Sequence, residues 1–289
     1  MKQTKEWGTT GKKLLWQILR TVAPAMARKL AVSRLYEHRA RESGQSPMVF
    51  INYGYAPLDA AEPRLELQPD HEFVRLPAQL YFHVAGQVEL TGREVLEVGS
   101  GQGGGCQFIR TYLKARRVVG LDLSKANVAI SRRINADTAV SFRVGDAEQL
   151  PFPPSSFDAV VNVESSHHYP ALGRFLREVH RVLRPGGAFL YADIFPAEGD
   201  SLHYSGGESM RRELNQCPLL QIGSKDITRN VIASLDARAE MILPKLRSYA
   251  GNEERLKSWI GWSRLPGTDG YRKLTDGRES YMSYLFRKG

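Results

Sequence analysis

The residues Glu97-Val98-Gly99-Ser100-Gly101-Gln102-Gly103-Gly104-Gly105 join a strand-like apolar segment to a helix-like one. Glycines at such a junction let the backbone pass close to a ligand, because no Cβ atom stands in the way. Gly99, Gly101 and Gly104 fit the GxGxxG pattern of dinucleotide sites, and Asp122 ends the next strand-like segment, where an acid can bind ribose hydroxyls. The loop predicts a nucleotide site and leaves a nicotinamide-dependent oxidoreductase open.

Two further acids favour a different nucleotide. Glu97 lies at the carboxyl end of the first strand-like segment, where it would repel a pyrophosphate and attract a cationic sulfonium amino acid. Asp146 and Ala147 follow the third such segment, in the run GDAEQLPF, and an acid there can accept a hydrogen bond from an adenine amino group. These positions favour S-adenosylmethionine (SAM) over a dinucleotide.

The next candidates lie in the run NVESSHHYP, which spans residues 162–170 and follows another apolar segment. Histidine has a pKa of about 6.5 and suits general-base chemistry at neutral pH. Two adjacent histidines are not expected to point in the same direction. We therefore take His167 as the expected base, if a hydroxyl must lose its proton, and His168 as the alternative.

Apolar segments alternate with helical patterns around these loops. The expected strands are 95–98, 118–123, 140–144, 157–163 and 188–194, and the expected helices between them are 103–114, 124–135 and 171–183, the last ending at Arg184-Pro185-Gly186-Gly187. This alternation predicts an α/β fold with a doubly wound parallel sheet. Helices are also expected at 12–23, 25–42, 71–87, 226–245 and 252–264, an insertion at 200–217 and a terminal strand at 281–286.

With Phe157-Asp158-Ala159-Val160-Val161 and Arg181-Val182-Leu183-Arg184-Pro185-Gly186-Gly187, the ordered motifs over residues 94–195 resemble the class I SAM-dependent methyltransferases. The resemblance implies a Rossmann-like seven-stranded sheet whose last strand is antiparallel and is supplied by residues 281–286. It also implies contacts of the glycine loop with SAM, ribose contacts after the second strand and adenine contacts after the third. The residues concerned are Gly99, Gly101, Gly103, Asp122, Leu123, Asp146 and Ala147.

Other segments are similar to actinobacterial methyltransferases of lipid and natural-product pathways, of the phthiotriolone and teleocidin type. They are Asn52-Tyr53-Gly54-Tyr55, Gln79-Leu80-Tyr81 and the terminal Gly277-Arg278 with Tyr281 and Tyr284. The resemblance implies an N-terminal aromatic segment that closes over SAM, where a tyrosine beside the sulfonium adds cation–π attraction. It adds Tyr53, Tyr55 and Gln79 to the expected cofactor contacts, which also include Glu97, Asn162 and Glu164.

Related O-methyltransferases carry a similar His-His-x-Pro loop and an acid at the end of the fifth strand, which implies Asp193 as the residue that orients His167. The expected reaction is methyl transfer from SAM to a hydroxyl of a small hydrophobic natural product or lipid. Carbon or nitrogen methylation stays open, because Glu164 and nearby tyrosines could stabilise a carbocation without a base. A SAM-binding protein without transferase activity and an NAD(P)-dependent oxidoreductase are the alternatives of a different class.

The net charge of +9 is unevenly distributed over the 289 residues. Residues 1–41 hold the ten basic residues and two acids that give this segment a charge of +8. The body is therefore close to neutral, which argues against a nucleic-acid partner. We expect a basic helical arm over 1–47 that forms a homo-oligomer, with membrane contact as the less favoured role.

The rest of the chain is expected to form one methyltransferase domain over 48–289. Within it we expect a cofactor core at 94–195, a lid and acceptor region at 196–275 and a terminal strand at 280–287. Cys106 and Cys217 form no metal-binding or disulfide pattern, so no metal site is expected. No apolar run is long enough to span a membrane, and a cytoplasmic location is expected.

Overall fold

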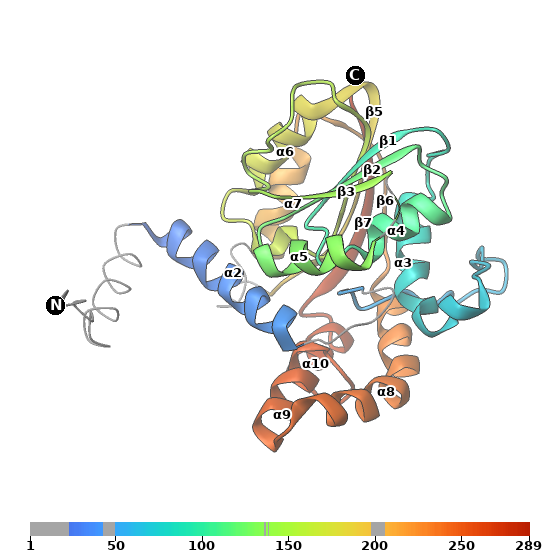
Figure 1. Ribbon diagram of the computed structural model, residues 1–289, viewed down its shortest axis with the longest axis vertical. Helices are drawn as coiled ribbons and strands as arrows, with labels where there is room; N and C mark the ends of the chain where they lie inside the picture. Colours follow the sequence, from blue (N-terminus) through green and yellow to red (C-terminus); the bar gives the residue numbers. More distant parts are fainter. Residues whose placement is uncertain (1–22, 43–49, 136, 138, 198–205) are drawn as a thin grey trace.

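A computed structural model describes residues 23–42, 50–135, 137, 139–197 and 206–289 (Figure 1). The helix expected at 12–23 lies almost entirely outside these ranges, as do five of the ten basic residues of the arm. The described chain forms a seven-stranded sheet in the order β3-β2-β1-β4-β5-β7-β6. This confirms the predicted Rossmann-like α/β fold.

Most elements are short and lie close to their expected positions. The strands are β1 (Glu94–Val98), β2 (Arg117–Asp122), β3 (Val140–Val144), β4 (Phe157–Val163), β5 (Leu183–Phe195), β6 (Leu220–Asp226) and β7 (Ser280–Arg287). The helices are α2 (Pro24–Glu42), η1 (Pro69–Val74), α3 (Arg75–Ala85), α4 (Gly104–Thr111), α5 (Lys125–Ile134), η2 (Ser166–His168), α6 (Leu172–Val182), α7 (Gly207–Asn215), α8 (Thr228–Ala250), α9 (Glu253–Trp262) and α10 (Asp269–Thr275). Strands β1 to β5 pair in parallel, and β7 is antiparallel to both of its neighbours, as expected for the terminal strand.

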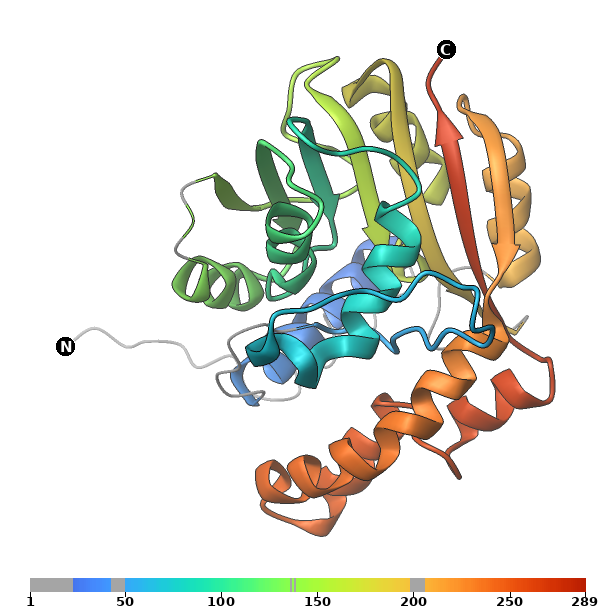
Figure 2. The same ribbon diagram turned by 90° about the vertical axis from the view of Figure 1, so that its right-hand side faces the viewer.

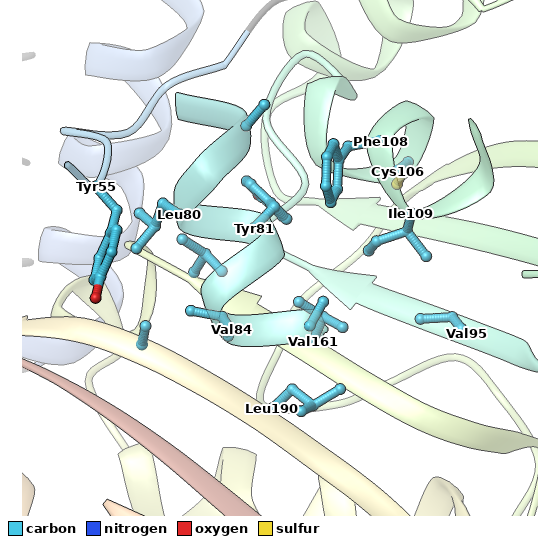
Figure 3. Packing of buried hydrophobic residues seen from close by; sticks show 14 of the residues in the cluster. Tyr55, Leu80, Tyr81, Val84, Val95, Cys106, Phe108, Ile109, Val161 and Leu190 are labelled. Atoms are coloured by element: carbon cyan, nitrogen blue, oxygen red, sulfur yellow. The ribbon is translucent and has the colours of Figure 1, made fainter. Parts of the chain in front are cut away.

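Buried side chains cover both faces of the sheet. On one face, Leu80 of α3 and Phe108 of α4 pack over Val95, Val161 and Leu190 of the strands (Figure 3). On the other face, the apolar side of α6 packs with α7 against alternate residues of the same strands. Because both faces are covered, a ligand can reach the sheet only at a strand edge or at the strand ends.

Four helices lie beyond the carboxyl ends of the parallel strands. Figures 1 and 2 show α2 on one side of this edge and the group α8, α9 and α10 on the other. The group α8–α10 has a small apolar cluster of its own, built around Leu246, Trp259 and Leu265. These helices enclose space above the ends of the strands, which is where a doubly wound sheet binds its ligands.

Helix α2 is attached to this edge by charged side chains. Lys29 Nζ lies 2.6 Å from Asp146 Oδ2 and 2.7 Å from Glu148 Oε2. Glu37 Oε1 accepts hydrogen bonds from Ser124 Oγ and from the backbone of Ala126, at the N-terminus of α5. Each bond holds α2 over the loops that follow β2 and β3.

The same helix is joined to α9 by Arg39. The Arg39 guanidinium lies 4.2 Å from the ring centroid of Trp259 and donates a hydrogen bond to Ser258 Oγ. The described part of the basic arm therefore packs on its own chain. Among the described residues, no helix is both long enough and apolar enough to cross a membrane.

The structure differs from the sequence expectation at three places. Residues 220–226, placed in the lid region, form edge strand β6, whose side chains are mostly exposed and lack the apolar signal of a buried strand. The strand β5 begins at Leu183, so the stop residues after α6 already belong to the strand. The short helix α10 was not expected; it is capped by Thr268, whose side chain accepts a hydrogen bond from the backbone of Tyr271.

A buried ion pair joins the group α8–α10 to β7. Arg264 Nη1 donates to Glu279 Oε2, and both side chains are almost fully buried. Breaking a buried pair leaves an uncompensated charge in a poorly solvated place, so Glu279→Gln should lower the free energy of unfolding by about 3 kcal/mol. Urea unfolding followed by circular dichroism measures this loss.

The exposed pair Arg278–Asp276 provides a matched control in the same segment. Because water solvates both groups in either state, Asp276→Asn should leave the free energy of unfolding close to that of the wild type. Equal losses for the two variants would show that the buried pair has no special role in stability.

Candidate functional site

A cavity lies at the carboxyl ends of β1, β2, β3 and β4, under α2; we call it the strand-end cavity. Its walls come from the glycine loop, the loops after the next strands and one face of α2. From α2, residues Lys29, Val32, Ser33 and Tyr36 line it at helical spacing. From the strand ends, the lining residues include Gly99, Ser100, Gly101, Asp122, Leu123, Asn127, Asp146, Ala147, Glu164, Ser165, His168 and Tyr169.

The glycine loop bends around one end of this cavity. Gly99 and Gly101 have φ values of 74° and 52°, which favour glycine over residues with a Cβ atom. The Gly101 amide donates a 2.8 Å hydrogen bond to Asp122 Oδ2, so the loop is tied to the end of β2. Gly103 is also left-handed, but it packs against Phe142 and does not line the cavity.

Carboxylates are concentrated around the strand-end cavity. Glu97 is fully buried behind the glycine loop and accepts a hydrogen bond from Tyr81 OH. Burial raises its pKa to about 7, and the nearby charge of Asp122 adds to this rise. Burial also raises the pKa of Asp122 to about 6, although backbone amides of Ser124 and Gly101 lower it in part. A bound cation would stabilise the ionised form of both acids.

Glu164 closes the opposite side and has a strained backbone. Its φ of 51° is unusual for a residue with a side chain. Its carboxylate accepts 2.8 Å hydrogen bonds from the Tyr53 backbone and from Tyr281 OH. Burial raises the pKa of Glu164 to about 7 against the effect of these two bonds. Strain and hydrogen bonds together fix the carboxylate where two cavities meet.

The second cavity has a volume of about 580 Å³ and lies between α2, the loop after β4 and the group α8–α10. We call it the helix-lined cavity. It shares Val32, Tyr36, Phe50, Ile51, Glu164 and His168 with the strand-end cavity. Apolar side chains such as Leu35, Ile242 and Trp262 form much of its wall. Two ligands could therefore meet at the shared residues.

His167 borders the helix-lined cavity and contacts Asp193. His167 Nδ1 lies 2.5 Å from Asp193 Oδ1, and Asp193 is fully buried at the end of β5. Burial alone would raise the pKa of Asp193, but the charge of His167 and hydrogen bonds from His167 and Ser166 lower it below its ordinary value. An ionised carboxylate accepts a hydrogen bond from a protonated Nδ1, which leaves Nε2 as the basic nitrogen of the neutral ring.

His168 has a different environment. Its Nε2 atom lies 3.2 Å from Tyr36 OH of α2, and the two rings are in an edge-to-face arrangement with centroids 5.6 Å apart. His168 borders both cavities. The two adjacent histidines therefore differ as expected: one contacts a buried acid, and the other contacts the covering helix.

Several expected cofactor residues do not reach the strand-end cavity. The Tyr55 hydroxyl donates to Glu62, and its ring stacks on His83 inside the core. Gln79 holds the loop before α3 through bonds to the backbone of Leu65 and Pro63. Both side chains therefore make hydrogen bonds or ring contacts within the fold, away from the strand-end cavity.

Asn162 and Tyr53 also lie outside the strand-end cavity. The Asn162 amide donates to Val98 O, Ser165 Oγ and Tyr169 OH, so it ties the ends of β1 and β4 together. Tyr53 borders the helix-lined cavity, where Arg264 Nε donates to its hydroxyl. Their contacts support the walls of the site.

The site also contains residues that the sequence motifs did not indicate. Lys29, Tyr36, Arg238 and Trp262 lie in segments without a recognised motif. The spacing of Lys29, Val32, Ser33 and Tyr36 on one helix face was a usable signal for α2. For Arg238 no local signal exists, because its position depends on how α8 crosses the end of the sheet.

Comparison with known proteins agrees with this geometry. Residues 96–191 match the family model of a methyltransferase domain. The chain is 34% identical over 254 residues to a fatty-acid O-methyltransferase of Mycolicibacterium smegmatis, with 88% of both chains covered. It is 36% identical over 263 residues to a phthiotriol/phenolphthiotriol dimycocerosates methyltransferase of Mycobacterium tuberculosis, with 88% of this chain and 90% of the relative covered.

A solved structure shares the fold. Geranyl diphosphate C-methyltransferase from Streptomyces coelicolor, in complex with Mg²⁺, geranyl diphosphate and S-adenosyl-L-homocysteine, superimposes with a TM-score of 0.65 at 17% identity. The alignment covers 91% of this chain and 98% of that chain. The fold and the strand-end site define the class of SAM-dependent methyltransferases. The chain belongs to this family, together with its mycobacterial relatives, as the sequence motifs predicted.

The raised pKa values of the buried acids predict how stability varies with pH. A carboxyl group with a raised pKa in the folded state favours folding while it is protonated. As the pH rises from about 4.5 to about 7, the unfolded chain loses this proton first, and stability falls by on the order of 1–3 kcal/mol per group. Urea unfolding of the ligand-free protein at pH 5.5 and pH 8 measures this change.

Glu164→Gln should flatten the pH dependence, because the amide stays neutral over the whole range. The exposed Glu66 offers a control, and Glu66→Gln should leave the pH dependence as in the wild type. Parallel pH curves for the wild type and Glu164→Gln would contradict the argument.

Proposed function

We propose that the chain transfers the methyl group of SAM to an oxygen atom of a small, mainly apolar molecule of the lipid or natural-product class. In this proposal SAM occupies the strand-end cavity, and the acceptor occupies the helix-lined cavity. The observation that carries the proposal is the contact between His167 and buried Asp193 at the wall of the second cavity. The relatives named above act on fatty acids and on phthiotriol-type lipids by their names, which supports a lipid-like acceptor.

The residues of the strand-end cavity fit SAM. Ser100 Oγ and Asn127 Oδ1 are buried at its wall and have no hydrogen-bond partner in the part of the chain that the structure describes. Gly99 and Gly101 keep side chains out of one end. Asp122 at the wall and Glu97, buried behind the glycine loop, favour a cation. These residues would hold the amino acid and ribose parts, and Asp146 and Ala147 would border the adenine.

SAM supplies an activated methyl group on a sulfonium, so the protein chiefly has to position the acceptor oxygen and accept its proton. In our proposal, Asp193 keeps the His167 ring in one orientation with Nδ1 protonated. His167 Nε2 then accepts the hydroxyl proton, and Asp193 stabilises the resulting imidazolium. Tyr36 and Phe50, which border both cavities, would limit the access of water.

One observation favours a second candidate reaction, the methylation of carbon. Glu164 lies at the junction of the cavities and is held by Tyr281, with Tyr53 nearby. An ionised carboxylate there could stabilise a positively charged intermediate of an alkene acceptor without any base. A SAM-binding protein without transfer activity would instead bind SAM and leave every acceptor unmodified. Transfer of labelled methyl to a lipid extract would distinguish either transfer reaction from SAM binding alone.

The proposal that His167 is the base predicts the effects of replacing His167 and Asp193. His167→Asn should lower kcat for methyl transfer by about 10²- to 10⁴-fold, because the ring nitrogen that accepts the proton is lost. Asp193→Asn should give a smaller loss, because the ring remains but loses its orientation. The affinity for S-adenosylhomocysteine, measured by calorimetry, should stay within about threefold of the wild type for both variants.

His168→Asn distinguishes the two histidines, and His180→Asn on the outer side of α6 is a control for histidine loss in general. We expect near wild-type kcat for His180→Asn and a far smaller loss for His168→Asn than for His167→Asn. If His168→Asn shows the large loss while His167→Asn is active, the base assignment moves to His168. If both keep wild-type rates, no histidine acts as the base.

The cofactor assignment predicts different effects at two glycines with the same φ of 74°, Gly99 and Gly92. A Cβ atom at Gly99 would come within 2.1 Å of Ser165 Oγ, whereas nothing lies within 4 Å at Gly92. Gly92→Ala should cost about 1 kcal/mol of stability for the backbone strain alone and leave binding unchanged. Gly99→Ala should weaken S-adenosylhomocysteine binding in calorimetry at least about tenfold; equal affinities would contradict the assigned site.

A further inference from the structure

Arg238 of α8 borders the helix-lined cavity. Its Nη1 atom donates a 2.8 Å hydrogen bond to the backbone oxygen of Asn52. Within the described residues, no carboxylate lies within ion-pair distance of this guanidinium. A guanidinium has five N–H donors in a planar fork, so this bond to Asn52 leaves most of the donor capacity for a ligand.

The other cations of the cavity are balanced by acids of the same chain. Arg264 pairs with buried Glu279, and Lys273 lies 3.4 Å from Asp269. Burial lowers the pKa of Arg238 to about 10, and the negative charge of Glu164 opposes this effect. The site thus bears the cost of a poorly solvated cation, which an anionic ligand would offset.

We propose that Arg238 binds a carboxylate of the acceptor molecule, so that the substrate is an amphipathic organic acid. Its apolar part would pack on Leu35, Ile242 and Trp262, which line the same cavity. A planar carboxylate matches the fork of a guanidinium with two parallel hydrogen bonds. This inference rests on the proposed function, because it takes the helix-lined cavity as the acceptor site.

The charges of the cavity favour a monoanion over a phosphate dianion. Glu164 and Asp269 also line the wall and would repel a second negative charge. A guanidinium that binds both oxygens makes them weaker nucleophiles, so in this proposal the bound carboxylate positions the acceptor and is not the group that is methylated. The oxygen that accepts the methyl group is then a separate hydroxyl of the same molecule, beside His167.

Calorimetry with three probes of equal chain length tests whether Arg238 binds a carboxylate, and it requires no methyl transfer. Dodecanoate, dodecanol and dodecyl phosphate are titrated into the full-length protein in the presence of S-adenosylhomocysteine, below micelle-forming concentrations. We expect the wild type to bind dodecanoate at least about tenfold more tightly than dodecanol. Dodecyl phosphate should bind more weakly than dodecanoate at pH 8, where it is a dianion.

Arg238→Met keeps an unbranched side chain and removes the charge, and Arg238→Lys keeps the charge and removes the planar fork of donors. Arg238→Met should abolish the preference for dodecanoate over dodecanol, and Arg238→Lys should retain part of it. Arg247→Met on the exposed side of α8 is the matched control and should behave as the wild type. Unchanged affinity for S-adenosylhomocysteine shows that each variant is folded.

The proposal that Arg238 binds the carboxylate is wrong if the wild type binds dodecanol as tightly as dodecanoate or if it binds neither probe. It is also wrong if Arg238→Met weakens the binding of both probes equally. Preferred binding of dodecyl phosphate would overturn the choice of a carboxylate. Failure of the proposed function has a different signature: dodecanoate binding that depends on Arg238, with no transfer of labelled methyl to any hydroxy acid or lipid extract.

Discussion

The burial of ionisable groups at the carboxyl edge of the parallel sheet is the constraint on which the site depends. Glu97, Asp122 and Glu164 end or follow three neighbouring strands, and burial raises the pKa of each. Such positions destabilise the ligand-free fold at neutral pH, and a bound cation would relieve the cost. Asp193 is the exception, because His167 and several donors hold it ionised. The same edge therefore has acids of two kinds: three that favour a cationic ligand and one that is satisfied by its own histidine.

Helix α2 links this edge to the rest of the chain through three charged side chains. Lys29 binds the acids after β3, Glu37 binds the N-terminus of α5, and Arg39 stacks on Trp259 of α9. The basic character of the N-terminal segment is thus used in part for contacts within the chain. Lys29 also donates a hydrogen bond to the Asp146 carboxylate, so a ligand that bonds to this acid must compete with Lys29 or use its other oxygen. The position of α2 and the occupancy of the strand-end cavity are coupled by this contact.

The fold and the strand-derived half of the site followed from the sequence because they depend on local signals. Apolar strands, glycines with positive φ and acids at strand ends are each readable in one segment, and parallel pairing brings their ends together. The helix-lined half did not follow, because Arg238, Trp262 and Tyr36 meet only through the packing of helices. For Gln79 and Tyr55, similarity of a short segment suggested ligand contacts, whereas the structure shows both side chains in hydrogen bonds within the chain.

The two cavities differ in charge, and this difference gives each a separate role in the proposed reaction. The strand-end cavity is bordered by acids that favour a cationic ligand, and the helix-lined cavity contains the Arg238 guanidinium, which favours an anionic ligand. A cationic donor and an anionic acceptor would then each be bound at one end and meet at the residues common to both cavities. Glu164, held in a strained conformation by Tyr53 and Tyr281, lies at that junction. Its carboxylate and the Arg238 guanidinium carry opposite charges in the same cavity. An acceptor that entered with its carboxylate toward Glu164 would be repelled, whereas one with its carboxylate toward Arg238 would be attracted. The two charges would therefore orient a molecule whose apolar body offers little to distinguish its two ends.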